Sequence, residues 1–192
     1  IYEGARESAR KFLNARHLDE VIFARSATGA LNTVASSLGR HLDIGEGDEI
    51  ILSIMQHHSN IVPWHFWRER HGAVIKWAPV DSDGHFLFEE FEKLITPRTK
   101  VIALTHMSNA LGTVTPLKDI VRVAHAHNIP VVADGSQGAV HLTVDVQDLD
   151  VDFYVFTGHK VYGPTGIGVL YGKKSWLEKL PPYEGGGEMI DL

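Results

Sequence analysis

Residues 154–168 read Tyr-Val-Phe-Thr-Gly-His-Lys-Val-Tyr-Gly-Pro-Thr-Gly-Ile-Gly, an apolar strand that runs into a turn of small residues. The turn carries Lys160 between aromatic and small side chains. A desolvated ammonium gives up its proton more readily, and the neutral amine is the nucleophile. The pattern therefore predicts that Lys160 forms a Schiff base.

Apolar runs alternate with helical patterns along the rest of the chain. Strands are expected at 21–24, 49–53, 73–80, 100–106, 129–133, 153–156 and 166–171, and helices near 2–13, 27–38, 59–70, 86–95, 116–124 and 175–180. Several of these strands are apolar throughout, which predicts an α/β domain with a mostly parallel mixed sheet of about seven strands and helices on both faces. The short connection between the last two strands favours one antiparallel strand.

Two helix starts are expected from capping residues. Ser59 is the predicted N-cap of the helix that runs to about Arg70, with Pro63 in its first turn. Thr115 is the predicted cap of a second helix that Pro116 begins.

Composition limits the class of protein. The chain has 192 residues, 44% of them hydrophobic and 22% charged, which fits one globular domain with a sizeable core. A net charge of -6 argues against a nucleic-acid surface, and no apolar run is long enough to predict a membrane span. The chain has no cysteine, so disulfides are excluded, and a cytoplasmic location is expected.

The ends of the chain suggest a part of a longer protein. It starts without methionine inside a helical pattern and ends soon after Gly185-Gly186-Gly187. We expect residues 1–192 to be an incomplete large domain, with an N-terminal segment and a C-terminal small domain outside them.

Polar side chains gather where the predicted strands end. In open α/β sheets ligands bind at the carboxyl ends of the strands. The residues expected there are Thr28, His57, Asn109, Asp134, Gln137, Thr157, His159 and Lys160. The sequence therefore predicts a single site at this edge of the sheet.

Each motif also has a plainer interpretation. Ala27 and Thr28 could present free backbone N–H groups to a phosphate at a helix start, or belong to an ordinary helix cap. His57 could lie over a cofactor ring or move protons, or be incidental among 12 histidines. Asp134 could pair with a pyridine nitrogen or cap the next helix. A zinc site at His57, His58 and His65 lacks any recognised ligand spacing, so no metal is expected.

Lys160 and Asp134 together favour one cofactor. Pyridoxal 5'-phosphate (PLP) needs an imine partner and a carboxylate that keeps its pyridine nitrogen protonated. The glycine spacing after Lys160 does not fit a nucleotide-binding loop, and it precedes a strand rather than a helix. PLP is therefore the predicted cofactor.

These motifs resemble a known family. The sequence is similar to class V aminotransferase-fold PLP enzymes, and more narrowly to the group II cysteine desulfurases and selenocysteine lyases. The resemblance rests on 56–64 (Gln-His-His-Ser-Asn-Ile-Val-Pro-Trp), 105–113 (Thr-His-Met-Ser-Asn-Ala-Leu-Gly-Thr), 134–137 (Asp-Gly-Ser-Gln), 152–156 (Asp-Phe-Tyr-Val-Phe), 157–168 and 184–190 (Glu-Gly-Gly-Gly-Glu-Met-Ile).

The resemblance implies a fold type I homodimer that removes sulfur or selenium from L-cysteine or L-selenocysteine and leaves L-alanine, with a possible sulfur-acceptor protein in iron–sulfur cluster assembly. The resemblance implies that Lys160 forms the imine with PLP, that Asp134 pairs with the pyridine nitrogen and that Gln137 hydrogen-bonds the phenolic oxygen. His57 would stack on the ring and transfer protons, and Asn109 would lie near the substrate. The phosphate would be held by Ala27, Thr28, Thr157 and His159.

The sequence departs from the family pattern in a few places. Members often have an acid where this chain has Gly29 and Gln56, and serine where it has Thr157. The persulfide-carrying cysteine and the arginine that binds the substrate carboxylate are expected beyond residue 192, so we expect the chain alone to be inactive as a desulfurase. Two alternatives stay open: another class V PLP enzyme (aminotransferase, kynureninase-like hydrolase or epimerase), or a non-catalytic fragment that retains the fold.

Overall fold

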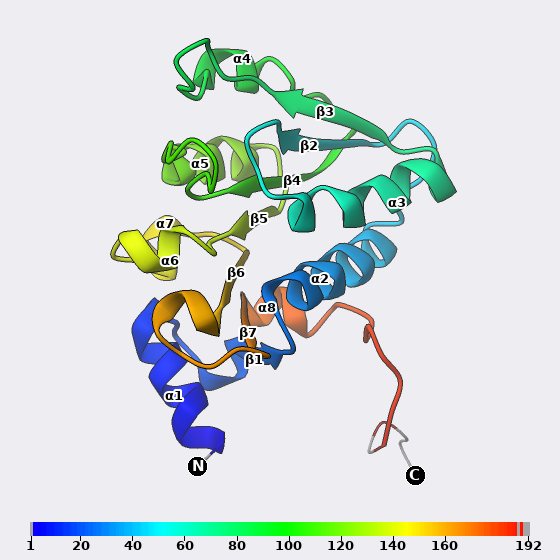
Figure 1. Ribbon diagram of the computed structural model, residues 1–192. Helices are drawn as coiled ribbons and strands as arrows, with labels where there is room; N and C mark the ends of the chain where they lie inside the picture. The colour runs from blue at the N-terminus through cyan, green and yellow to red at the C-terminus, as the bar shows by residue number, and fades with distance from the viewer. Residues whose placement is uncertain (1, 188, 190–192) are drawn as a thin grey trace.

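The fold is a seven-stranded sheet between two helical layers, in a computed structural model that describes residues 2–187 and 189 (Figure 1). The strands are β1 (Val21–Ala24), β2 (Glu49–Ser53), β3 (Val74–Ala78), β4 (Thr99–Thr105), β5 (Val131–Asp134), β6 (Phe153–Thr157) and β7 (Gly168–Gly172). The α-helices are α1 (Tyr2–Leu13), α2 (Ala27–His41), α3 (Val62–His71), α4 (Phe88–Glu92), α5 (Leu117–Ala126), α6 (Gly138–His141), α7 (Val146–Leu149) and α8 (Lys174–Leu177). Three short 3₁₀ turns are η1 (Leu18–Glu20), η2 (His58–Asn60) and η3 (Gly158–Val161).

The strand order is β1-β7-β6-β5-β4-β2-β3. All pairings from β3 through β2, β4 and β5 to β6 are parallel, whereas β7 is antiparallel to both β6 and β1. The predicted α/β class with a mostly parallel sheet is confirmed, and the antiparallel member is the last strand.

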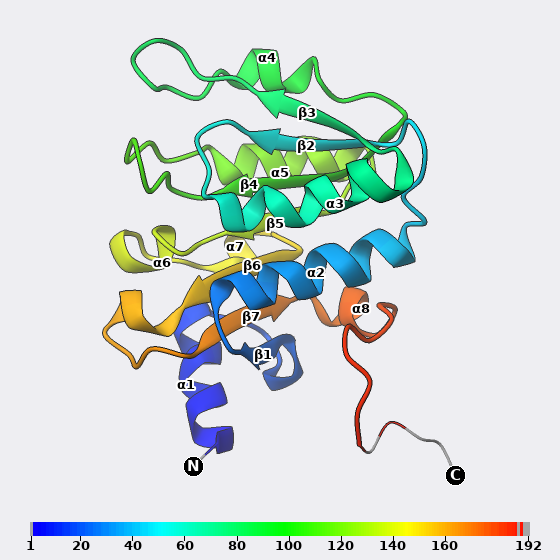
Figure 2. The same cartoon turned by 45° about the vertical axis from the view of Figure 1, so that its right-hand side comes forward.

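Two separate cores lie on the two faces of the sheet. In β4, Val101 and Ala103 pack into the core under α2 and α3, while Ile102 and Leu104 pack into the other core against α5. Figure 2 shows α2 and α3 on the near face of the sheet and α5 behind it. This alternation, with both faces buried, explains why the strands read as continuous apolar runs.

Both predicted caps are wrong. Helix α3 begins at Val62 with Ile61 at the N-cap, and Ser59 lies in the preceding 3₁₀ turn η2. Helix α5 begins at Leu117 after Pro116 and has no side-chain cap, because the Thr115 hydroxyl donates 2.8 Å to the carbonyl of Thr105 instead. The Ser59 hydroxyl contacts Thr28 and the Thr115 hydroxyl contacts Thr105, so neither hydroxyl is bonded to the helix that the sequence pattern predicted it to cap.

Other boundaries differ by a few residues. The helix expected over 86–95 is only α4, and the short elements η1, η2, η3, α6 and α7 were not predicted. Elements of three or four residues carry too little periodicity to be read from sequence.

Among the described helices, none combines the length and apolar composition that a bilayer crossing requires.

Candidate active site

A pocket of about 210 Å³ lies where β4, β5 and β6 end, beside the first turn of α2. It is lined by Ser26, Ala27, Thr28, His57, Ser59, Thr105, Met107, Asn109, Asp134, Ser136, Gln137, Thr157, His159 and Lys160. Every candidate residue from the sequence therefore lies in one pocket.

The strand period explains why these residues meet. Val132 and Val155 belong to the core under α2 and α3, so the residues two positions further along, Asp134 and Thr157, face the same side. Thr105 follows Ala103 in the same way and pairs with Asp134 across β4 and β5. Adjacent strands are about 4.8 Å apart, so three polar side chains form a row at the start of α2.

The sequence did not indicate as site residues five others that also line the pocket: Ser26, Ser59, Thr105, Met107 and Ser136. Ser59 and Ser136 lie within predicted motifs, two residues from His57 and from Asp134. That spacing was the available signal, because a residue two positions from a site residue in a tight turn can fold back beside it.

The start of α2 leaves backbone donors free. Ser26 is the N-cap, and its hydroxyl oxygen accepts the N–H of Gly29 at 3.0 Å. Within residues 2–187 and 189, the N–H groups of Ala27 and Thr28 have no hydrogen-bond acceptor. Ser26 therefore makes the helix cap, and the N–H groups of the next two residues could bond an anion.

Gly168 allows β7 to pack closely against the start of α2. A Cβ at Gly168 in β7 would lie 2.3 Å from the carbonyl carbon of Ser26. No side chain fits there, so glycine lets β7 pack directly against the backbone that begins α2.

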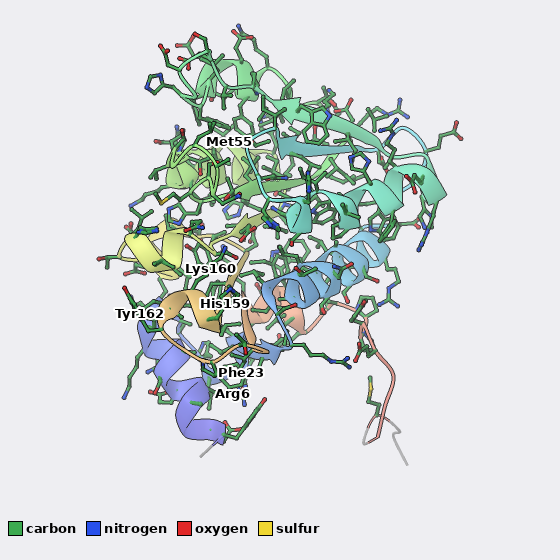
Figure 3. All side chains as sticks on the ribbon, in the orientation of Figure 1. Arg6, Phe23, Met55, His159, Lys160 and Tyr162 are labelled. Atoms are coloured by element: carbon green, nitrogen blue, oxygen red, sulfur yellow. The ribbon has the colours of Figure 1, made fainter. Side chains whose placement is uncertain are left out.

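Lys160 projects from η3, next to His159 (Figure 3). It is half-buried, and its Nζ has no hydrogen-bond or ion-pair partner among the described residues. The chain alone therefore does not desolvate this lysine as fully as the sequence suggested. Tyr162, in the same turn, is 98% exposed and lies apart from Lys160 in Figure 3.

Thr157, the last residue of β6, contacts two neighbouring polar groups. The Thr157 hydroxyl lies 3.1 Å from Nδ1 of His159 and donates to the carbonyl of Ile167 at 3.3 Å. The direction of the contact with His159 follows the tautomer of the imidazole, whose Nδ1 donates when it carries the proton and accepts when it does not. This contact holds the exposed imidazole at the mouth of the pocket.

Asp134 is the buried acid of the site, with 4% of its surface exposed. One carboxylate oxygen, Oδ1, accepts the Ser136 N–H at 3.0 Å. Helix α6 has Gln137 at its N-cap without a side-chain cap, so Asp134 does not cap it. The local bond to Ser136 orients the carboxylate, and the side chain also lines the pocket.

Two aromatic side chains support the turn after β5 from beneath. His106 Nδ1 lies 2.9 Å from the Tyr154 hydroxyl, and both residues are buried. A Cβ at Gly135 would lie 2.0 Å from the Tyr154 ring, and one at Gly138 would lie 2.7 Å from His106 Nδ1. The turn that carries Asp134 thus rests directly on this pair.

The electrostatics of the pair follow from burial. Burial lowers the pKa of His106 to about 4, so its imidazole is neutral at physiological pH. Burial, and to a smaller extent the charge of Asp134, raises the pKa of Tyr154 far above its usual range. The support beneath Asp134 is therefore uncharged.

His57 is exposed and ends the loop after β2. Its Nδ1 accepts the Ser59 N–H at 3.1 Å and lies 2.9 Å from the Ser59 hydroxyl. The same hydroxyl lies 2.8 Å from Oγ1 of Thr28. A chain of polar contacts thus joins His57 to the start of α2.

The whole chain, residues 1–192, matches the family described as aminotransferase class-V. The chain belongs to that family. It is 51% identical over 191 residues to a probable cysteine desulfurase of Halalkalibacterium halodurans, covering 100% of this chain and 47% of that protein. It is 50% identical over 189 residues to a cysteine desulfurase of Synechococcus elongatus, covering 98% of this chain and 30% of that protein.

A solved structure gives the same result. The cysteine desulfurase CsdA of Escherichia coli superposes with a TM-score of 0.94 at 42% identity, covering 100% of this chain and 48% of that one. The chain therefore spans about half the length of the H. halodurans protein and of E. coli CsdA, and less of the S. elongatus protein. The resemblance stated from sequence motifs is confirmed at the level of family, and the match in fold covers the whole sheet.

The residues whose side chains could bind a metal ion lie outside this pocket. Within the part of the chain that the structure describes, one group, Asp81, Asp83 and His85, brings its ligand atoms within 4.8 Å of one another. This group is exposed, and Asp81 already accepts the backbone N–H groups of Asp83 and His85 at 2.9 Å. The alternative zinc site at His57, His58 and His65 does not form such a group.

The pocket as a whole combines three kinds of group. Free N–H groups and hydroxyls suit an anion, a lysine amine suits a carbonyl carbon, and a buried carboxylate suits a cationic ring nitrogen. A ligand that carries a phosphate, an aldehyde and a pyridine ring would use all three.

Proposed function

We propose that residues 1–192 are the PLP-binding large domain of a longer cysteine desulfurase or selenocysteine lyase. One observation carries the proposal: the Asp134 carboxylate at the end of β5 and the Lys160 amine just after the adjacent parallel strand β6 line the same pocket. That pair is what a protein supplies to PLP. The membership in the class-V family and the relatives named cysteine desulfurase support it.

The donor set fits the phosphate of PLP. Ala27 and Thr28 offer backbone N–H groups at the positive end of a 15-residue helix, and Thr28 adds a hydroxyl. Thr157 and His159 lie at the end of β6 beside the start of α2, where a phosphate could draw the hydroxyl and imidazole protons to itself. These four residues would hold the phosphate and fix the position of the ring.

Lys160 and Asp134 would fix the ring at two other points. Lys160, whose Nζ has no partner among the described residues, is free to bond the aldehyde carbon. The buried Asp134 carboxylate would accept a hydrogen bond from the protonated ring nitrogen. When bound, PLP withdraws electrons from the substrate carbon next to the imine.

The remaining residues would set orientation and proton transfer. Gln137 would donate its amide to the phenolic oxygen of the cofactor, and Asn109 would lie near substrate and that oxygen. His57 would cover the ring and move a proton at one of its nitrogens. No metal takes part in this proposal.

The substrate would be L-cysteine or L-selenocysteine, from which sulfur or selenium is removed to leave L-alanine. The sequence has no cysteine, so a persulfide-carrying cysteine would have to come from outside these residues. A homodimer and a sulfur-acceptor protein in iron–sulfur cluster assembly belong to the same proposal. The cytoplasmic location remains a prediction from sequence.

The test has two parts. PLP titrated into the chain is expected to give the visible absorbance band of lysine-bound cofactor, which Lys160→Ala removes and Lys118→Ala, at an exposed lysine paired with Asp148, leaves intact. The full-length enzyme given L-cysteine is expected to release alanine and sulfur. A keto acid product would instead assign another class V activity, and a band that survives in Lys160→Ala would contradict the role of this lysine.

A further inference from the structure

The contacts of His57 define which nitrogen carries its proton. The Ser59 backbone N–H can only donate, and it points at His57 Nδ1 over 3.1 Å. Nδ1 must therefore accept, so the neutral imidazole carries its proton on Nε2. His57 also lines the pocket, which makes this N–H available there.

The Ser59 hydroxyl stands between two partners. Its oxygen lies 2.9 Å from His57 Nδ1 and 2.8 Å from Thr28 Oγ1. A hydroxyl has one proton, so it can donate to His57 or to Thr28, but not to both at once. The choice depends on where the Thr28 hydroxyl proton points.

We propose that Ser59 is a positioning residue that holds His57 in the Nε2–H tautomer and couples its hydrogen bonding to the phosphate held at Thr28. The inference rests on the proposed function, because it takes the start of α2 as the phosphate site. The sequence indicated Ser59 as a helix cap and not as a residue of the site.

The coupling follows from the direction of the hydroxyl protons. Without an anion, Thr28 Oγ1–H donates to Ser59, and Ser59 Oγ–H donates to His57 Nδ1. A phosphate oxygen draws the Thr28 proton to itself, because a charged acceptor makes the stronger bond. Ser59 then donates to Thr28, and His57 Nδ1 keeps only the backbone N–H.

The experiment uses nitrogen NMR of the histidine side chains at mildly alkaline pH, where imidazole is neutral, with inorganic phosphate as the probe. His57 is expected to show the Nε2–H tautomer, and phosphate is expected to move its Nδ1 signal toward the value of a less hydrogen-bonded nitrogen. Backbone amide signals of Ala27 and Thr28 report phosphate binding independently of His57.

Ser59→Ala keeps the backbone N–H and removes the hydroxyl. It is expected to retain the tautomer and the amide response to phosphate but to lose the shift at His57. Thr28→Val, which breaks the other end of the link, is expected to lose the same shift. Ser36→Ala, on the same helix but with no hydroxyl hydrogen bond in the described residues, is the control and is expected to respond like the unchanged chain.

Three results would overturn the proposal. An Nδ1–H tautomer of His57 would contradict the positioning role directly. An unchanged His57 shift in Ser59→Ala, with phosphate bound at Ala27 and Thr28, would refute the coupling and leave the proposed function standing. No phosphate response at those two amides would overturn both the coupling and the phosphate assignment in the proposed function.

Discussion

His106 and Tyr154 form a buried hydrogen bond, with 2.9 Å between the imidazole Nδ1 and the phenolic oxygen. Tyr154 belongs to the core on the face of the sheet away from α2, whereas Asp134 faces α2. The pair therefore contacts the turn of Asp134 from the side opposite to the pocket. It is a support for the site rather than a part of it.

Tyr154→Phe is expected to lower the free energy of unfolding by about 1–3 kcal/mol, because it leaves a buried ring nitrogen of His106 without its partner. Chemical denaturation measures the change. Tyr171→Phe is the matched control, because Tyr171 is also buried but its hydroxyl has no hydrogen bond among the described residues. Equal losses in the two variants would show that the bond to His106 contributes nothing measurable.

His106 also predicts a loss of stability in acid. Burial lowers its pKa to about 4, whereas an imidazole in the unfolded chain titrates near pH 6.5. The unfolded state alone binds this proton between those values, so stability is present above pH ~6.5 and falls by about 3 kcal/mol as pH drops to ~4. His106→Asn is expected to flatten this part of the curve of unfolding free energy against pH, whatever its effect at neutral pH. A curve of unchanged slope would contradict the prediction.

His125 predicts the opposite pH dependence. Its Nε2 lies 2.8 Å from buried Asp152 and its Nδ1 lies 3.1 Å from Asp150. The hydrogen bond to Asp152 raises the pKa of His125. A raised pKa contributes stability that is complete below the unfolded value, near pH 6.5, and is lost as pH rises through the folded value.

His125→Gln is therefore expected to destabilise the chain more at mildly acidic pH than at mildly alkaline pH. Unfolding free energies of the two proteins at both pH values measure this. A difference that grows as pH rises would contradict the protonated contact with Asp152.

Gly135→Ala tests the close packing behind Asp134. The new Cβ would lie 2.0 Å from the Tyr154 ring, so either the ring or the turn must move. We expect a loss of about 3 kcal/mol or more in unfolding free energy, together with weaker PLP binding because the turn carries Asp134 and Gln137. Gly185→Ala, where no atom lies within 4 Å, is the control and is expected to change stability by less than about 0.5 kcal/mol. Tolerance of both substitutions would mean that the turn does not depend on this contact.

Much of the fold was predictable because its strands are apolar and regularly separated by helices. The strands at 21–24 and 49–53 were predicted to the residue, and the inward side chains Leu117, Ile120, Val121 and Ala124 of α5 are all buried. The rule that ligands bind at the carboxyl ends of strands predicted that the candidate residues lie together at one edge of the sheet. Strand positions, the buried face of a helix and the residues at strand ends all follow from the spacing of apolar residues, which can be read directly from the sequence.

What could not be predicted depends on contacts between distant segments. The Thr115 hydroxyl bonds to Thr105 rather than to a helix, and Ser59 bonds to Thr28 across 31 positions of sequence. The contact of Tyr154 with His106 and Gly135 likewise requires that β4, β5 and β6 lie in their final order. Such hydroxyl and ring contacts have no period in the sequence, so only the folded structure reveals them.

Lys160 is the residue that we propose binds PLP covalently. Incubation of the chain with PLP, reduction with borohydride and peptide mass spectrometry locate the lysine that carries the cofactor. We expect the modification at Lys160, competed away by inorganic phosphate and absent from Lys160→Ala. Labelling spread over exposed lysines such as Lys118 and Lys179, with Lys160 no more modified than they are, would contradict it.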